Sequence, residues 1–295
     1  MHYKFIIKVR QSNLVVYSVY MVSKIITNVL VYLINITNNE QRIHRLSSKA
    51  FHRKYVIKSI DDKLEVQNRI LSFKKLISDA IRPSDNLKRF GSKNDGGYLV
   101  FSKIDNGTNL VSCGIGSDTS FEFQIASQVK NVYMFDHTID KVDGLSKNMF
   151  FFKKGVDVET SGLYTTLGDI IMKNDIKKSI LKMDIEGMEW RILDSISLEF
   201  LTKFDQIIIE LHNLFEISLS DRGDLYFRVI KKLTALFTIV NIHPNNWGEY
   251  RVLCGIPFVD TLELTMVNKN FVPKAPSNPV NLNSPNNPEE PDFVF

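Results

Sequence analysis

The chain has 295 residues, 44% of them hydrophobic, which is long enough for one well-buried α/β domain with extensions and too short for two full-sized domains to be the default. Its 37 Lys and Arg residues against 33 Asp and Glu leave a net charge of only +4, and zinc-finger spacing, an RNA-binding aromatic signature and a long basic helix are all missing. These features argue against nucleic acid as the main partner. The two cysteines, Cys113 and Cys254, are too few for a disulfide framework or a thiolate metal site.

The N-terminal region, residues 1–59, is predicted to be an extension of the domain. Residues 13–36 are mostly Val, Ile, Leu, Tyr and Met and approach the length of a membrane span, but polar residues interrupt them. Lys24, Asn28 and Asn35 fall near one another on a helical wheel, which favours an amphipathic helix over a lipid-exposed span. A cytoplasmic location is favoured, with peripheral membrane contact through this segment or a membrane anchor as the alternatives left open.

The next region, residues 60–272, alternates helix and strand patterns and is predicted to be the core domain. It opens with a helix from about Ile60 to Ala80. The strands predicted after it are Asn109 to Cys113, Val132 to Phe135, one within Met149 to Val158, Ser179 to Met183 and Gln206 to Leu211, with helices at Thr119 to Lys130, after Gly187 and around Leu225 to Leu236. Such alternation predicts a largely parallel sheet covered on both faces.

The end of this region gives two successive strands, Phe237 to Ile242 and Thr261 to Val267, with a polar turn at residues 244–248 and no helix between them. Strands joined in this way pair antiparallel. The predicted fold is therefore a Rossmann-like, doubly wound α/β sheet of seven strands, mostly parallel, with a C-terminal antiparallel hairpin. A dehydrogenase would continue with a second βαβαβ half instead. Residues 273–295, rich in Pro and Asn, are predicted to be a disordered tail.

A glycine-containing turn follows the first predicted strand of the sheet. Gly114 and Gly116 come directly after this strand, and Asp136 ends the next strand about 20 residues later, as at the start of a nucleotide-binding βαβ unit. Glycines let the backbone turn sharply beside a ligand, and a carboxylate can accept hydrogen bonds from both ribose hydroxyls. Thr119 stands where a dinucleotide motif has its third glycine, so S-adenosylmethionine is favoured over a dinucleotide. The predicted cofactor-binding residues are Gly97, Tyr98, Cys113, Gly114, Gly116, Ser117, Asp118 and Asp136.

Six short motifs carry a resemblance to a known family. They are Lys-Asn-Asp-Gly-Gly-Tyr at residues 93–98, Ser-Cys-Gly-Ile-Gly at 112–116, Leu-Lys-Met-Asp-Ile-Glu-Gly-Met-Glu-Trp at 181–190, Glu-Leu-His at 210–212, His-x-Asn-Asn at 243–246 and Leu-Glu-Leu-Thr at 262–265. Together they resemble the FkbM-like and methyltransferase-like 24 group of class I methyltransferases, over about residues 90–269. The resemblance implies O-methylation, often of a sugar hydroxyl in a glycan or a glycosylated small molecule.

The candidate catalytic residues lie at the predicted carboxyl ends of strands, where open α/β sheets bind ligands. They are Asp184, Glu210, His212 and His243. A sugar hydroxyl needs a base or a metal ion to take or polarise its proton. Glu210 and His212, two residues apart on a strand, face the same side, and His212 is the candidate general base. With Asp184 they could also hold Mg²⁺.

Each of these assignments has a structural alternative. Asp184 could cap the following helix, His212 could be a buried histidine with satisfied hydrogen bonds, and His243, otherwise a candidate acceptor contact, could belong to a hairpin turn. Two other functions stay open for the whole chain. One is a nicotinamide-dependent oxidoreductase, and the other is a non-catalytic Rossmann-like module that docks on a membrane or a partner.

Overall fold

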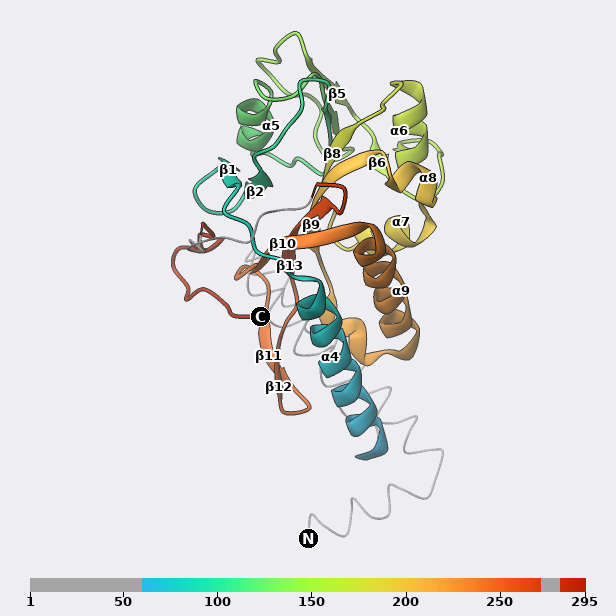
Figure 1. Ribbon diagram of the computed structural model, residues 1–295, viewed down its shortest axis with the longest axis vertical. Coiled ribbons are helices and arrows are strands. Elements are labelled where there is room, and N and C mark those ends of the chain that lie inside the picture. Colours follow the sequence, from blue (N-terminus) through green and yellow to red (C-terminus); the bar gives the residue numbers. More distant parts are fainter. Residues whose placement is uncertain (1–59, 272–281) are drawn as a thin grey trace, which may run out of the picture. The chain divides into compact units, whose positions relative to one another are not determined.

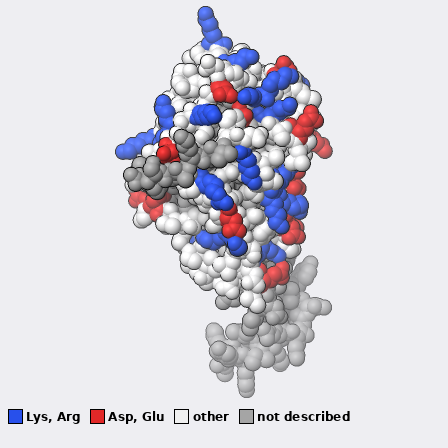
Figure 2. All heavy atoms as spheres, viewed as in Figure 1, with Lys and Arg blue, Asp and Glu red and all other residues white. Residues whose placement is uncertain are grey.

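The computed structural model of the protein describes residues 60–271 and 282–295. The described residues from Lys63 onward belong to one compact unit. The predicted N-terminal extension, residues 1–59, lies outside the described residues, and the predicted domain boundaries stay predictions. Among the described helices, none combines the length and apolar character that crossing a membrane requires. Basic and acidic side chains are interspersed over the face of the described residues that Figure 2 shows. The expectation that nucleic acid is not a partner stays a prediction.

A seven-stranded sheet forms the centre of the domain (Figure 1). Its strands, in spatial order, are β10 (Phe237–Pro244), β13 (Leu262–Asn268), β9 (Phe204–Leu211), β8 (Ser179–Met183), β3 (Asn109–Cys113), β4 (Val132–Phe135) and β5 (Met149–Phe152). The strands from β9 to β5 pair in parallel, whereas β13 runs antiparallel to both β9 and β10. Strand order switches direction between β3 and β8, and in such sheets the ligand crevice lies at the C-terminal ends of the strands at this point.

Apolar side chains alternate along the central strands and build a core on each face of the sheet. Val111 and Leu181 point to a face covered by α4 (Ile60–Ala80), α6 (Leu167–Lys173), α7 (Glu189–Ser195) and α9 (Ser220–Leu236). Leu110 and Ile180 point to the opposite face, covered by α5 (Ser120–Ile125) and the antiparallel pair β1 (Leu87–Gly91) and β2 (Gly97–Phe101). Strands buried on both faces must be apolar throughout, which accounts for their uninterrupted hydrophobic runs.

The structure confirms the seven-stranded α/β sheet and its terminal antiparallel pair, and it differs in the connections. The link between β10 and β13 contains a further hairpin, β11 (Tyr250–Leu253) with β12 (Ile256–Val259), where the sequence suggests one polar turn. The helix predicted to reach Lys130 ends at Ile125, since the side chain of Asn148 donates to the carbonyl oxygen of Ala126 at 2.9 Å and residues 126–130 form turns. The remaining short elements are β6 (Gly155–Val156), β7 (Tyr164–Thr165), α8 (Leu198–Leu201) and the 3-10 helix η1 (Leu214–Ser218).

The C-terminal segment differs most from the sequence-based prediction of disorder. Residues 273–281 lie outside the described residues, but residues 282–295 make defined contacts with the domain without forming a helix or strand. Asn286 is 2% exposed, and its side chain donates a hydrogen bond to Glu263. Phe293 and Phe295 pack against the apolar core. Composition hides this arrangement, because asparagine side chains and backbone carbonyls make most of the contacts and leave no apolar periodicity to detect.

Candidate active site

A cavity of about 620 Å³ lies at the C-terminal ends of β3, β4 and β8. The turn after β3, the end of β4 and the loop after β8 form its wall. Its volume lies within the range of roughly 300–1,000 Å³ that is typical of small-molecule sites. The crevice expected from the switch in strand order is therefore open, and side chains do not fill it.

Gly114 and Gly116 shape the turn that forms one side of this cavity. Gly114 has a φ of +73°, and a Cβ atom on it would lie 1.7 Å from the carbonyl oxygen of Asp184. Only glycine lets the ends of β3 and β8 approach this closely. Gly116 has a φ of +54°, but no described atom lies within 4 Å of its Cβ position, and it lines the cavity. The first glycine joins two strands, whereas the second leaves room for a ligand.

Asp136, at the end of β4, points toward this turn. Its Oδ2 accepts hydrogen bonds from the N–H groups of Ile115 and Gly116, both at 3.0 Å. Its Oδ1 accepts from the N–H and the hydroxyl of Thr138, at 2.7 and 2.6 Å. Burial raises the pKa of Asp136, but these hydrogen bonds outweigh burial and hold the pKa below its usual value. Since all four lone-pair directions are used, a ribose hydroxyl can reach this carboxylate only by replacing one of the donors.

The other predicted cofactor residues divide into cavity wall and support. The members of the predicted set that line the cavity are Tyr98, Gly114, Gly116, Ser117, Asp118 and Asp136. Gly97 and Cys113 do not line it. A Cβ atom on Gly97 would lie 1.9 Å from the carbonyl oxygen of Ser92, and Cys113 is fully buried within β3. These two residues keep neighbouring backbones close, and the contacts of the whole set with a cofactor stay predictions.

Three of the four predicted catalytic residues converge beside the cavity. Asp184 follows β8, while Glu210 and His212 lie at the end of the adjacent parallel strand β9. His212 Nε2 lies 3.5 Å from Glu210 Oε1 and 3.8 Å from Asp184 Oδ1. One ligand atom from each residue lies within 4.8 Å of the other two, so the three residues are called here the acid–histidine cluster. Two carboxylates and one imidazole nitrogen thus face a common point.

Buried aromatic and acidic groups hold His212 in this cluster. Trp190 stacks on Tyr226 with ring centroids 3.9 Å apart, and its indole N–H donates to the carbonyl oxygen of His212 at 2.8 Å. The His212 Nδ1 atom lies 3.0 Å from Oε1 of Glu189, which is fully buried. These contacts fix both the backbone and the ring of His212, so Nε2 faces the two carboxylates.

The charges of the cluster depend on one another. Burial alone lowers the pKa of His212, but the hydrogen bond with Glu189 and the surrounding carboxylates raise it to about 10. A pKa this high places a proton on His212 near neutral pH in this arrangement, where it balances negative charge, and its predicted role as general base stays a prediction. Burial and then the charge of Asp184 raise the pKa of Glu210 well above its usual value. Asn245 donates to Glu210 Oε1 at 2.7 Å, and the Tyr98 hydroxyl donates to Asp184 Oδ2 at 2.8 Å.

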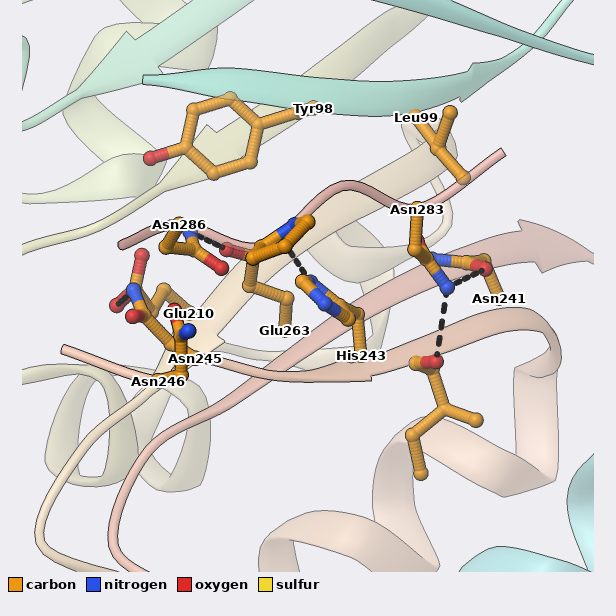
Figure 3. Close-up of polar contacts among 12 residues, drawn as sticks. Tyr98, Leu99, Glu210, Asn241, His243, Asn245, Asn246, Glu263, Asn283 and Asn286 are labelled. Carbon is orange, nitrogen blue, oxygen red and sulfur yellow. Dashed lines mark hydrogen bonds and ion pairs between the residues drawn. The ribbon is translucent and has the colours of Figure 1, made fainter. Parts of the chain in front are cut away.

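His243, the fourth predicted catalytic residue, does not join the cluster or line the cavity. It lies near the end of β10 and is 3% exposed. Its Nδ1 lies 3.4 Å from Glu263, and its Nε2 lies 3.0 Å from Asp292 in the C-terminal segment. Figure 3 shows His243 with Glu263 beside the asparagines of this region. Its role as an acceptor contact stays a prediction.

Sequence reasoning missed Lys182, which is 4% exposed although it carries a charge. Its Nζ donates to the carbonyl oxygen of Gly114, lies 3.8 Å from Asp184 Oδ2 and stands 5.0 Å from the centre of the Tyr98 ring. Lys182 thus connects the glycine turn to the catalytic side of the cavity. A lysine between apolar residues of a buried strand was the signal that could have found it, because a buried charge needs partners.

Comparison with known proteins assigns the chain to a family. A family model described as the methyltransferase FkbM domain matches residues 80–236, more than half of the chain. The chain belongs to the FkbM methyltransferase family. The matched domain is that of a methyltransferase that depends on S-adenosylmethionine, and this decides against the nicotinamide-dependent oxidoreductase.

This chain is similar to one human protein and, more distantly, to several solved structures. The probable methyltransferase-like protein 24 of Homo sapiens is 30% identical over 135 residues, which are 40% of this chain and 37% of that protein. The precorrin 8W decarboxylase of Methanobacterium thermoautotrophicum is 14% identical with a TM-score of 0.33, covering 56% of this chain and 84% of that one. A putative tRNA (m1A22) methyltransferase of Streptococcus pneumoniae, in complex with S-adenosyl-L-methionine, is 14% identical with a TM-score of 0.33, covering 57% and 69%.

The cavity of this FkbM methyltransferase suits S-adenosylmethionine in its chemistry. The open space at Gly116 admits a ligand close to the backbone, and Asp136 is an ionised carboxylate beside it. At the other side, Asp95 and Asp184 give the wall acidic groups, which complement the positive sulfonium of this cofactor. The open space at Gly116 and the acidic wall thus fit a positively charged ligand, and a ribose hydroxyl would bind Asp136 by replacing one of its present donors.

Proposed function

We propose that the enzyme transfers its methyl group to oxygen and that the acceptor is a sugar hydroxyl of a glycan or a glycosylated small molecule. The observation that carries this proposal is the group of polar side chains where β8, β9 and β10 end, of which Asp184 lines the cavity and the others lie buried beside it. There Asp184, Glu210 and Asn245 present carboxylate and amide groups in and beside the cavity. Such groups suit a molecule with several hydroxyls, because carboxylates accept hydrogen bonds and amides both donate and accept them.

Asp184 is the residue best placed to act on the acceptor hydroxyl. S-adenosylmethionine supplies an activated methyl group when it is bound, so the chain must hold the acceptor oxygen in line with it and receive the hydroxyl proton. Asp184 lines the cavity, and the Tyr98 hydroxyl fixes its Oδ2 atom. Its Oδ1 atom stays directed toward His212 Nε2, 3.8 Å away. Asp184 can therefore orient the hydroxyl and accept its proton.

The proposal includes a divalent cation in the acid–histidine cluster, where it would replace the proton on His212 Nε2, because an imidazole nitrogen binds a metal only when it is unprotonated. Around an octahedral ion with ligand distances of about 2.1 Å, adjacent ligand atoms are roughly 3.0 Å apart and opposite ones roughly 4.2 Å apart. The distances from His212 Nε2 to Glu210 and Asp184, 3.5 and 3.8 Å, lie between these limits. Glu189 holds the His212 Nδ1 atom, as carboxylates do for metal-binding histidines. Mg²⁺ prefers oxygen ligands, and the imidazole nitrogen extends the choice to Mn²⁺ or Zn²⁺. A cation here would polarise the acceptor hydroxyl.

Methyl transfer from radiolabelled S-adenosylmethionine to defined sugars tests the acceptor class. The probes are the methyl glycosides of glucose, galactose, mannose, rhamnose, fucose and N-acetylglucosamine, each supplied to the full chain with Mg²⁺ or Mn²⁺. We expect a labelled O-methyl sugar from at least one of them. Calorimetry with S-adenosylhomocysteine shows separately that the cofactor site is competent. If this ligand binds and label passes to a phenol or a primary amine but to none of the sugars, the proposed acceptor class is wrong.

A further inference from the structure

A C-terminal strap, defined as residues 282–292, covers buried polar side chains beside the active site. These side chains lie at the ends of β9 and β10, at the start of β13 and in the turn after β10. They are Glu210, His243, Asn245, Asn246 and Glu263, each no more than 7% exposed, and are called here the polar cluster. Figure 3 shows them together with Asn286 of the strap. Buried polar groups require hydrogen-bond partners, and the strap supplies several of them.

The contacts between the strap and the polar cluster are hydrogen bonds and ion pairs. Asn286 Nδ2 donates to Glu263 Oε1 at 2.6 Å. The side chain of Asn246 donates to the carbonyl oxygen of Asn287 at 2.9 Å and accepts from its N–H at 2.6 Å. The Asp292 carboxylate lies 3.0 Å from His243 Nε2. The strap thus offers the cluster amide, carbonyl and carboxylate groups.

The strap is anchored beyond its end. Phe293 and Phe295 pack against rings of the β11–β12 hairpin, with centroids 5.2 and 6.4 Å apart. Between Leu282 and Phe293, by contrast, no residue is hydrophobic. A hydrogen bond contributes only about 0.5–1.5 kcal/mol to such docking, because water replaces it when the strap leaves. A ligand with similar polar groups can therefore compete for the polar cluster.

The polar cluster is continuous with the catalytic side of the cavity. Glu263 pairs in register with Glu210 across β13 and β9, and Glu210 lies 3.5 Å from His212 Nε2. The carbonyl oxygen of Asn286 accepts from the N–H of Asp95 at 3.3 Å, and Asp95 lines the cavity. The strap therefore lies close to the acid–histidine cluster and to the wall of the cavity.

Asn286 shows that the strap does not satisfy this place completely. Its Oδ1 atom is buried and has no hydrogen-bond partner among the described residues. An unpaired buried acceptor is costly, by about 1–3 kcal/mol. Displacement of the strap would expose this atom to water and remove that cost, which favours exchange of the strap for a ligand.

We propose that the polar cluster is the binding site for the sugar part of the acceptor and that the strap is its internal occupant, which the acceptor displaces. This inference rests on the proposed sugar methyltransferase function. The Glu263 carboxylate, the Asn246 amide and the His243 ring, which the strap now contacts, bind the ring hydroxyls in its place. Glu210 and Asn245, hydrogen-bonded to each other, lie beside them. The apparent affinity for the acceptor is then reduced by the fraction of molecules in which the strap is open.

Hydrogen exchange in the full chain, loaded with S-adenosylhomocysteine, reads the position of the strap without requiring methyl transfer. The probes are the six methyl glycosides named above. We expect a bound sugar to speed amide exchange in residues 282–292 and to slow it in residues 243–248. A strap that is a permanent wall of the site would instead become more protected when sugar binds.

Two matched variants set the strap equilibrium. Asn286→Asp places a carboxylate against Glu263 and should open the strap, whereas Asn287→Asp makes the same charge change at a side chain that accepts from Glu289 within the strap. Asn286→Ala removes the donor without adding charge. In both Asn286 variants, we expect the sugar concentration that gives half of the maximal change in amide exchange to be roughly tenfold lower. In Asn287→Asp this concentration should be close to that of the unsubstituted chain. The affinity for S-adenosylhomocysteine should be unchanged in all three variants.

A crosslink between the strap and β10 would hold the strap in its closed position. The side chains of Asn241 and Asn283 exchange hydrogen bonds at 3.0 and 3.2 Å, so cysteines at both positions lie within reach of a short bis-maleimide. The background is Cys254→Ser, because Cys254 is partly exposed and Cys113 is buried. The crosslinked chain should bind S-adenosylhomocysteine normally but show no sugar-dependent exchange. The same double-cysteine chain without crosslinker is its control.

The two readouts together separate this inference from the proposed function. Faster strap exchange with labelled sugar supports both, and faster exchange without labelled sugar supports the inference while contradicting sugar methylation. Labelled sugar with unchanged strap exchange, or equal activity of the crosslinked chain, overturns the inference and leaves the function intact. If no sugar is labelled and none alters strap exchange, both are overturned.

Discussion

The cofactor side and the acceptor side of the site are built in different ways. At the ends of β3 and β4, backbone geometry dominates: two glycines with positive φ set the turn, and Asp136 binds backbone N–H groups. At the ends of β8, β9 and β10, carboxylates, an imidazole and an amide from distant segments form ion pairs and hydrogen bonds. A backbone cradle tolerates little change in shape, whereas a side-chain cluster tolerates change in shape but not in charge. Substitutions should therefore have different consequences on the two sides.

The largest effect is expected on the acceptor side, from Asp184→Asn. The variant keeps the shape of the side chain but removes the group that orients the hydroxyl and accepts its proton. Turnover should fall by about 10²–10⁴-fold, while the affinity for S-adenosylhomocysteine changes little. Rates with labelled S-adenosylmethionine and calorimetry measure the two quantities. Glu199→Gln, an exposed change on α8, is the control, and an Asp184→Asn chain with full turnover would contradict the assignment.

The cofactor side is tested by two glycine substitutions that separate shape from space. Gly114→Ala places a Cβ atom against the Asp184 carbonyl oxygen, so it should lower the free energy of unfolding by about 3 kcal/mol or more. Gly116→Ala meets no described atom and should cost only about 1 kcal/mol, from its backbone conformation. Its methyl group should instead weaken S-adenosylhomocysteine binding. Urea denaturation checks the order, and equal losses in both variants would show that the two strand ends are not in contact as described.

The variant Glu210→Gln tests whether the acid–histidine cluster on the acceptor side binds a divalent cation. Mn²⁺ binding to the full chain, followed by the electron paramagnetic resonance of the free ion, should be at least tenfold weaker in this variant. Removing metal with EDTA should lower turnover in the unsubstituted chain, and added Mg²⁺ or Mn²⁺ should restore it. Glu199→Gln again provides the control. Equal Mn²⁺ binding by the Glu210→Gln chain would exclude the acid–histidine cluster as the cation site.

The smallest effect concerns Thr138→Val, which removes one donor from Asp136. The free energy of unfolding should fall by about 1 kcal/mol at neutral pH. Since hydrogen bonds hold the pKa of Asp136 below its unfolded value, their contribution is complete above about pH 4 and is lost as pH falls through the folded pKa. The gap between the two chains should therefore be widest at neutral pH and close in acid. A gap that widens in acid would contradict the described hydrogen bonds.

Local patterns predicted much of the fold and part of the site. The strand Ser179–Met183 has the predicted bounds, because its apolar run is short and ends in a polar motif. The convergence of Asp184, Glu210 and His212 also follows from sequence, since adjacent parallel strands end at the same edge of a sheet. The β11–β12 hairpin was missed, because its strands are short and partly exposed.

The amino-acid sequence by itself determined the sheet, the glycine turn and the family, because these depend on periodicity and on backbone conformations that particular residues require. Only the tertiary structure decided which charged groups interact with one another and which side chains are buried. It buries Lys182 between the glycine turn and Asp184, surrounds His212 with carboxylates that raise its pKa and places Asn286 against Glu263. The physical reason is that charge balance and burial depend on distances between segments far apart in the chain, and no local pattern records those distances.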